Sequence, residues 1–264
     1  MSFSYLNKIK LLLYLSGIAL FISSCASKSF YIPAAAGNDV SYLPKPMESD
    51  SIKVKNYISA SLSGVSLPRN TGNIDLGFLN ISRGHTFKNF NVAYGIYGFA
   101  GQASYDQEFN NGKAELNGKG IYGGGLRSSI GFYDNAGNAE FRIISWDNSL
   151  SFENGSYATF RQEMYNLDAS NIISSTKNSL YTTGISSEII WHSKRNWDNH
   201  FAFKLFYGKS IGLNKSLENF AAGNTPKGGA FSSSFYIKLK NLFGIVDVNF
   251  NKNSGGKLSL GYAF

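Results

Sequence analysis

The chain has 264 residues, and only 16% of them are charged, against about 25% in an ordinary soluble domain. Glycine and aromatic residues are abundant and proline is scarce, a composition that suits one all-β domain of many strands joined by turns. The net charge is +8, but the basic residues are scattered and form no nucleic-acid-binding motif, which excludes nucleic acid as a partner.

The N-terminus has the features of an export signal. Lys8 and Lys10 form a positive region, and residues 11–22 form an apolar stretch. This stretch is shorter than the about 20 residues that a membrane-spanning helix needs. The pattern predicts that residues 1–24 are a signal peptide that is removed.

The residues that end this segment are Ile22-Ser23-Ser24-Cys25. They resemble the bacterial lipobox, in which an aliphatic residue and two small residues precede a cysteine that becomes lipidated. The resemblance implies that Cys25 is the mature N-terminus and carries palmitate or a similar acyl chain. The alternative is an ordinary signal peptide with a chance cysteine. Cys25 is the single cysteine of the chain, so no intrachain disulfide is possible.

Residues 25–50 are predicted to be the lipidated N-terminus followed by an extended tether, because they contain Pro33, Pro44 and Pro46. The composition of the chain resembles that of Bacteroidota proteins. In that phylum, lipoproteins exported to the surface usually carry acidic residues just after the cysteine. Ala26-Ser27-Lys28-Ser29 contains none, so this resemblance implies an anchor in the periplasmic leaflet.

Residues 51–264 show recurrent alternation of apolar and polar residues, the period of a β-strand. Between 200 and 211, for example, Phe201, Phe203 and Leu205 share one face, and Lys204 lies on the other. Eleven segments are candidate strands: 51–65, 71–82, 89–104, 117–133, 139–152, 156–167, 179–192, 200–211, 231–240, 244–251 and 256–264.

These strands are predicted to form an antiparallel up-and-down β-barrel of about 10–12 strands in an outer membrane. Several are longer than strands of soluble proteins, and tight turns (134–138, 194–198, 241–243) contrast with long loops (105–114, 213–228). Single-chain bacterial barrels have an even strand number. An additional strand at 171–175 would give twelve, and merging two candidates would give ten.

The C-terminus offers a second resemblance. Lys257, Tyr262 and Phe264 match the signal by which outer-membrane barrels reach their assembly machinery, whereas Ser259 stands where glycine is usual. The match implies the barrel-assembly machinery as a partner during biogenesis. The simpler interpretation is a last core strand that ends in Phe264.

Charged residues of the predicted strands are the main candidates for a site. Buried charges must pair, so we expect a network inside the barrel, which either plugs the lumen or forms a selectivity ring. Its predicted members are Arg127, Glu140, Arg142, Arg161, Glu163 and Glu188. The sequence shows no zinc-ligand spacing and no nucleophile elbow, and we predict no cofactor, metal or catalytic residue.

The sequence therefore predicts a non-enzymatic outer-membrane lipoprotein that binds a partner, a lipid or a small solute through its loops or lumen. One alternative is a soluble periplasmic β-sandwich or lipocalin-like module tethered by Cys25. Another is an outer-membrane enzyme that modifies lipids. The direction of the face that holds Phe201, Phe203 and Leu205 distinguishes a membrane barrel from a soluble module, whose apolar face points inward.

Overall fold

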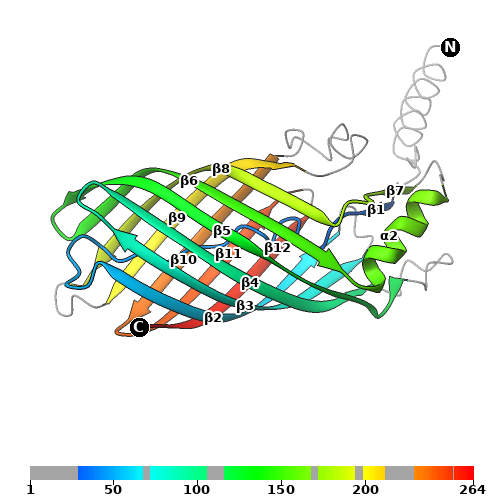
Figure 1. Ribbon diagram of the computed structural model, residues 1–264, viewed down its shortest axis with the longest axis horizontal. Helices are drawn as coiled ribbons and strands as arrows, with labels where there is room; N and C mark the ends of the chain where they lie inside the picture. The colour runs from blue at the N-terminus through cyan, green and yellow to red at the C-terminus, as the bar shows by residue number, and fades with distance from the viewer. Residues whose placement is uncertain are drawn as a thin grey trace, which may run out of the picture.

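The computed structural model describes residues 29–67, 72–105, 116–167, 172–193, 199–211, 229–251 and 253–264. Within these ranges ten strands form one closed antiparallel barrel in which each strand pairs with its neighbours along the chain (Figure 1). The closing pair joins β12 to β2. The barrel strands are β2 (Val54–Ser66), β3 (Asn73–Thr86), β4 (Phe90–Ser104), β5 (Lys119–Ala136), β6 (Ala139–Asn154), β8 (Ser179–His192), β9 (His200–Ile211), β10 (Gly229–Leu239), β11 (Leu242–Phe250) and β12 (Ser254–Ala263).

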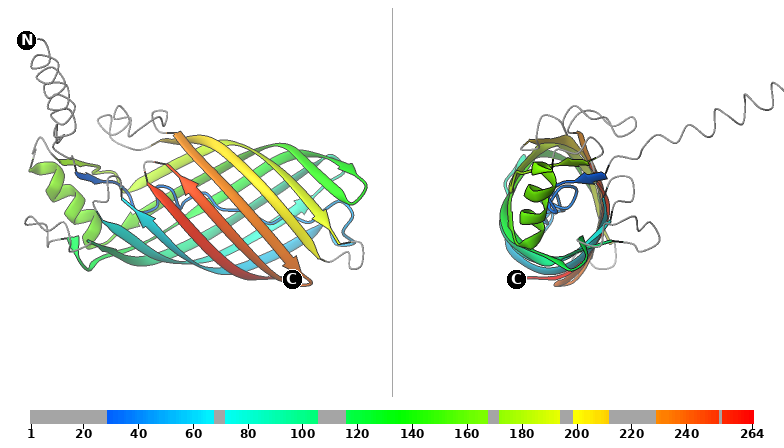
Figure 2. Two further views of the ribbon diagram at one scale, coloured as in Figure 1. Left: turned by 180° about the vertical axis from the view of Figure 1, so that it is seen from behind. Right: turned by 90° about the vertical axis from the view of Figure 1, so that its right-hand side faces the viewer.

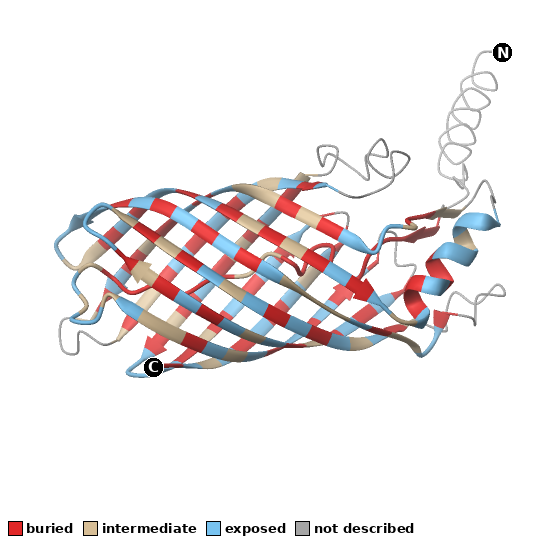
Figure 3. Cartoon of the chain, in the orientation of Figure 1, coloured by how far each residue is buried: buried red, intermediate tan, exposed pale blue. Residues whose placement is uncertain are grey.

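The outside of the barrel is apolar. Exposed and buried residues alternate along the strands (Figure 3). On β9, Phe203, Leu205 and Tyr207 are exposed, whereas Ala202 and Lys204 are buried in the lumen. The predicted apolar face therefore points outward, as it does in membrane barrels, where apolar residues face lipid. This arrangement rules out the soluble sandwich or lipocalin-like module, whose apolar residues would point inward. No helix among the described residues is long and apolar enough to cross a membrane.

One predicted strand is wrong. Residues 156–167 were expected to be a strand, but Ser156–Asn166 form the helix α2. Its buried residues are Tyr157, Ala158, Phe160 and Arg161, a spacing that places them on one side of a helix. The barrel has ten strands for this reason. The short strand β7 (Ile172–Ser174), where an additional barrel strand was considered, pairs in parallel with β1 (Ser29–Tyr31) outside the barrel sheet.

The two ends of the barrel differ. At the end where β2 starts and β12 finishes, strands β5 and β6 are joined across Gly137 and Asn138, and β10 and β11 across Lys240 and Asn241. Gly137 and Lys240 have positive φ angles of 62° and 56°, as tight hairpin turns require. We call this the short-turn end. The opposite end holds α2, β1 and β7 (Figure 1), and we call it the long-loop end. The predicted turn 194–198 and the loops 106–114 and 213–228 lie outside the described residues.

The expected tether is wrong in its described part. Residues 29–47, called the plug below, run through the inside of the barrel (Figure 2), and all of them except Val40 and Ser41 are buried. Phe30, Tyr31 and Ile32 pack against wall side chains of the long-loop end. The prolines were misleading: proline favours extended backbone and lacks an N–H, which also suits an extended segment inside protein.

If lipid surrounds the barrel, Leu205→Arg should destabilise it by about 2–4 kcal/mol, the cost of a basic residue on a barrel's lipid face near the midplane. Leu205→Met is the matched control and should cost much less. The measurement is denaturant unfolding in lipid vesicles. An exposed site in water would tolerate arginine within about 0.5 kcal/mol, so equal stabilities of the two variants would contradict the membrane assignment.

Candidate functional site

At the long-loop end, where the plug enters the barrel, its first residues pack against the short strand β7 and the helix α2. Its strand β1 pairs with β7, and the Ser175 amide donates to the carbonyl of Tyr31 at 2.9 Å. The Tyr157 hydroxyl, on α2, donates to the carbonyl of Ile32 at 2.9 Å. The Tyr31 ring packs edge-on against Phe160, with 5.0 Å between centroids. The α2 segment therefore fixes the plug where it enters the lumen.

A buried carboxylate receives the next residues of the plug. The Ala34 amide donates to Oε2 of Glu153, at the end of β6, over 2.6 Å. Oε1 of Glu153 pairs with the guanidinium of Arg161, which also donates to the carbonyl of Lys177 at 3.0 Å. Glu153 of the wall thus accepts hydrogen bonds from plug N–H groups, and Arg161 of α2 compensates the charge of its carboxylate.

Two cations hold the middle of the plug by its carbonyl oxygens. Nε of Arg127, on β5, donates to the carbonyl of Asp39 at 2.6 Å, and its guanidinium lies 3.8 Å from the centre of the Tyr97 ring. Nζ of Lys257, on β12, donates to the carbonyl of Asn38 at 3.0 Å. Both cations are buried and use the main chain of the plug as acceptor.

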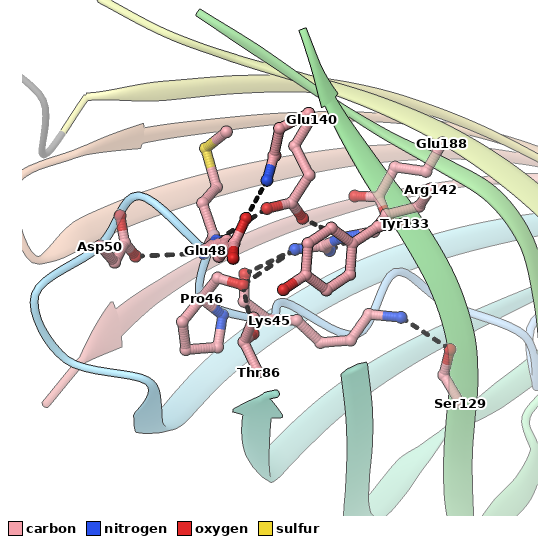
Figure 4. Close-up of polar contacts among 12 residues, drawn as sticks. Lys45, Pro46, Glu48, Asp50, Thr86, Ser129, Tyr133, Glu140, Arg142 and Glu188 are labelled. Atoms are coloured by element: carbon pink, nitrogen blue, oxygen red, sulfur yellow. Dashed lines mark hydrogen bonds and ion pairs between the residues drawn. The ribbon is translucent and has the colours of Figure 1, made fainter. Parts of the chain in front are cut away.

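The densest cluster surrounds Arg142, whose side chain is fully buried (Figure 4). Its Nε lies 2.8 Å from Oε1 of Glu140, and its Nη1 lies 3.1 Å from Oε2 of Glu188. Nη2 donates to the carbonyls of Lys45 at 3.2 Å and Pro46 at 3.0 Å. One guanidinium thus pairs with two wall acids and binds the plug.

Other plug atoms and the residue that follows the plug, Glu48, complete this cluster. The Glu48 amide donates to Oε2 of Glu140 at 2.7 Å, and the Tyr42 hydroxyl donates to Glu188. Nζ of Lys45 donates to Oγ of Ser129 at 2.9 Å. Beside the cluster, Lys204 and Asp147 form a further buried pair with 2.6 Å between Nζ and Oδ2.

Where the plug leaves the barrel, Asp50 lies 3.1 Å from Nε2 of His200. Burial alone would raise the pKa of the Asp50 carboxyl, but the hydrogen bond and charge of His200 and the charge of Lys55 outweigh it, so the pKa is lowered. His192 lies opposite His200 in the β8–β9 register. Among the described residues, no group of His, Cys, Asp and Glu could hold a metal ion.

The predicted network is thus divided among three places. Arg142, Glu140 and Glu188 lie together, whereas Arg127 and Arg161 each lie in a separate lumenal cluster. Glu163 is a correction: it is exposed on α2, because the segment is a helix and its alternation was misread. The sequence analysis placed Lys204 on the face opposite Phe203, and that face lines the lumen. It missed further charged lumen residues that the same periodicity could have found: Asp147, Glu153, Asp247 and Lys257.

Little space is left between plug and wall in the middle of the lumen. A cavity beside Ser41 and a second beside Gly37 measure about 10 Å³ each, roughly enough for one water molecule. Arg127, Arg142, Glu153, Glu188 and Lys257 each lie within hydrogen-bonding distance of plug atoms, and Lys204 and Asp147 pair with each other. Around residues 29–47 this arrangement is a structural network in a lumen that the plug occupies.

No protein-family model and no curated protein sequence matches this chain. Among solved structures, the chain is similar to the translocator domain of the autotransporter NalP from Neisseria meningitidis, with a TM-score of 0.40, 8% identity and coverage of 82% of this chain and 90% of that one. It is also similar to the outer-membrane protease OmpT from Escherichia coli, with a TM-score of 0.35, 8% identity and coverage of 83% and 99%. A KdgM porin in complex with disordered oligogalacturonate is similar with a TM-score of 0.33, 14% identity and coverage of 79% of this chain and 99% of that one. Similarities at this level carry no conclusion on what this chain does.

Arg142→Gln should destabilise the protein by about 3–5 kcal/mol, because it leaves two buried carboxylates without their cation. The measurement is the denaturant midpoint of the refolded protein in lipid or detergent. Adding Glu140→Gln and Glu188→Gln to the same protein removes both negative charges and should recover most of the loss. A cost below about 1 kcal/mol for the single variant would show that Arg142 does not hold this cluster together.

Proposed function

We propose that this protein is a non-enzymatic outer-membrane lipoprotein whose barrel spans the membrane with a closed lumen and which acts by binding at its ends. The observation that carries the proposal is the plug: residues 29–47 occupy the lumen, and wall charges bind their main chain. A solute cannot use the lumen while the plug is in place. Binding of a partner, a lipid or a small solute is therefore assigned to surfaces outside it.

The lipoprotein part of the proposal rests on the lipobox-like Ile22-Ser23-Ser24-Cys25 and on the absence of any other cysteine. The assembly machinery of the outer membrane is proposed as the partner during biogenesis, on the basis of the C-terminal residues. Tyr262 and Phe264 are exposed on the outer wall, and Lys257 points into the lumen, so the three residues are divided between the two faces of the strand.

The orientation follows from the two ends of the barrel. Outer-membrane barrels have short periplasmic turns and longer external loops. Applied to this chain, the rule places the short-turn end in the periplasm and α2, β1 and β7 outside. The external end is then the proposed binding surface. A cleft of about 480 Å³ at the short-turn end, with Glu48, Lys53, Lys88 and Asn135 among its lining residues, offers a second surface on the periplasmic side.

The purified wild-type protein should give no steady conductance in a planar lipid bilayer. Gly84→Val should give intermittent openings, because a Cβ at Gly84 would lie 2.8 Å from the carbonyl oxygen of Pro44 and 3.0 Å from Cα of Lys45, closer than packed atoms allow. Gly77→Val is the matched control, since its Cβ would meet its nearest atom at 3.8 Å, and should behave as wild type. A steady channel formed by the wild-type protein would contradict the closed lumen.

A further inference from the structure

Contacts along strand β6 show the direction in which the plug runs through the barrel. From the short-turn end to the long-loop end, Glu140 binds Glu48, Arg142 binds Pro46, Ser149 binds Asp39 and Glu153 binds Ala34. The residue numbers of the contacted segment fall steadily as the residue numbers along β6 rise, so the two run in opposite directions. The chain therefore passes through the whole barrel from the long-loop end, at Ser29, to the short-turn end, where it turns back and begins β2.

From this direction we infer that Cys25 carries its lipid in the leaflet at the long-loop end, which is the outer, cell-surface leaflet. The inference rests on the proposed lipidation and orientation. It replaces the periplasmic-leaflet anchor expected from the absence of acidic residues after Cys25. The protein is then a surface lipoprotein anchored on the opposite side of the membrane from the first residue of its own barrel, Val54.

The reach of the chain makes the assignment independent of how residues 25–28 are arranged. Four residue steps separate Cys25 from Ser29, and a fully extended chain covers at most about 3.6 Å per step, or roughly 14 Å. The hydrocarbon core of a bilayer is about 30 Å thick. Acyl chains on Cys25 therefore cannot cross to the periplasmic leaflet while β1 stays paired with β7. The acyl chains also cannot reach the periplasmic side through the lumen, because the plug occupies it.

The same geometry constrains assembly. A lipidated end cannot be pushed through a lumen that the plug fills, where the cavities beside Ser41 and Gly37 measure about 10 Å³ each. The barrel must instead close around the plug. The β2–β12 pair is where this closure occurs, since these are the first and last strands of the barrel and no connection links them directly.

Single thiols at three positions test the inference. If Cys25 is a thioether, the mature chain has no free thiol, so Lys28→Cys, Asn224→Cys and Ala136→Cys each introduce one. Cells are treated with a membrane-impermeant maleimide, either intact or after permeabilisation of the outer membrane. Lys28 adjoins Ser29, and Asn224 belongs to the connection between β9 and β10, whose described ends, Ile211 and Gly229, lie at the long-loop end. Both variants should label fully in intact cells. Ala136→Cys, which is exposed at the short-turn end, should label only after permeabilisation.

Two results would overturn the inference, and they are distinguishable. Labelling of Asn224→Cys but not Lys28→Cys in intact cells would show that the N-terminus does not leave the barrel at the loop side. Labelling of Ala136→Cys alone would show that the proposed orientation is inverted. The lipid is tested separately: incorporation of an alkyne palmitate should be lost in Cys25→Ser. Its absence from the wild type would refute the proposed lipidation, and the thiol pattern, repeated with Cys25→Ser as background, would still test the direction of the plug.

Discussion

The main chain of the plug crosses the interior of a barrel whose strands already use their own N–H and C=O groups in pairing with one another. A buried backbone group without a partner costs free energy comparable to a lost hydrogen bond. Beyond β1 the plug forms no strand. A turn satisfies the amides of Ala36, Asn38 and Asp39 through the carbonyls of Pro33 and Ala35, and several of its remaining groups bind side chains of the wall. Buried charges of the lumen supply these partners. Arg127, Arg142 and Lys257 donate to plug carbonyls, Glu153 accepts from the Ala34 amide, and Glu140 accepts from the amide of Glu48, directly after the plug.

This requirement explains why the wall is charged and why its charges are paired. An isolated ion in the lumen would be very costly, and a pair repays its desolvation only when further hydrogen bonds satisfy the remaining atoms. Arg142 meets both conditions, with two acids and two plug carbonyls around one guanidinium. Charge-assisted hydrogen bonds are also the strong ones, so the same groups that permit burial of the plug fix its register against β6.

The sequence predicted the strands of the barrel well, but it did not predict the plug inside the barrel or the helix α2. Alternation along β9 placed Phe203 and Leu205 outside because a strand reverses the side of its side chains at every residue, whatever the partner strand. The same periodicity brought Glu140 and Arg142 to one face. It failed at 156–167, where a helix carries Glu163 away from the lumen and Arg161 toward Glu153. Nothing local distinguishes a proline-containing tether in water from a plug in a lumen, since the difference lies in wall residues far away in the sequence, such as Glu153, which is 119 positions from Ala34.

The central claim is that residues 29–47 lie inside the barrel, and an engineered disulfide tests it most directly. A Cβ on Gly37 lies 3.6 Å from Cβ of Asn253 on the wall, within the range of about 3.5–4.5 Å that a disulfide spans. With Cys25→Ser as background, Gly37→Cys with Asn253→Cys should form an intrachain bond in the folded protein, detected as a mobility shift that reductant reverses. The control pair, Gly37→Cys with the outward-facing Leu258→Cys, carries the same strain at Gly37, whose φ is +86°, and should stay reduced. If both pairs kept free thiols accessible to maleimide in the folded protein, the plug would not be where this account places it.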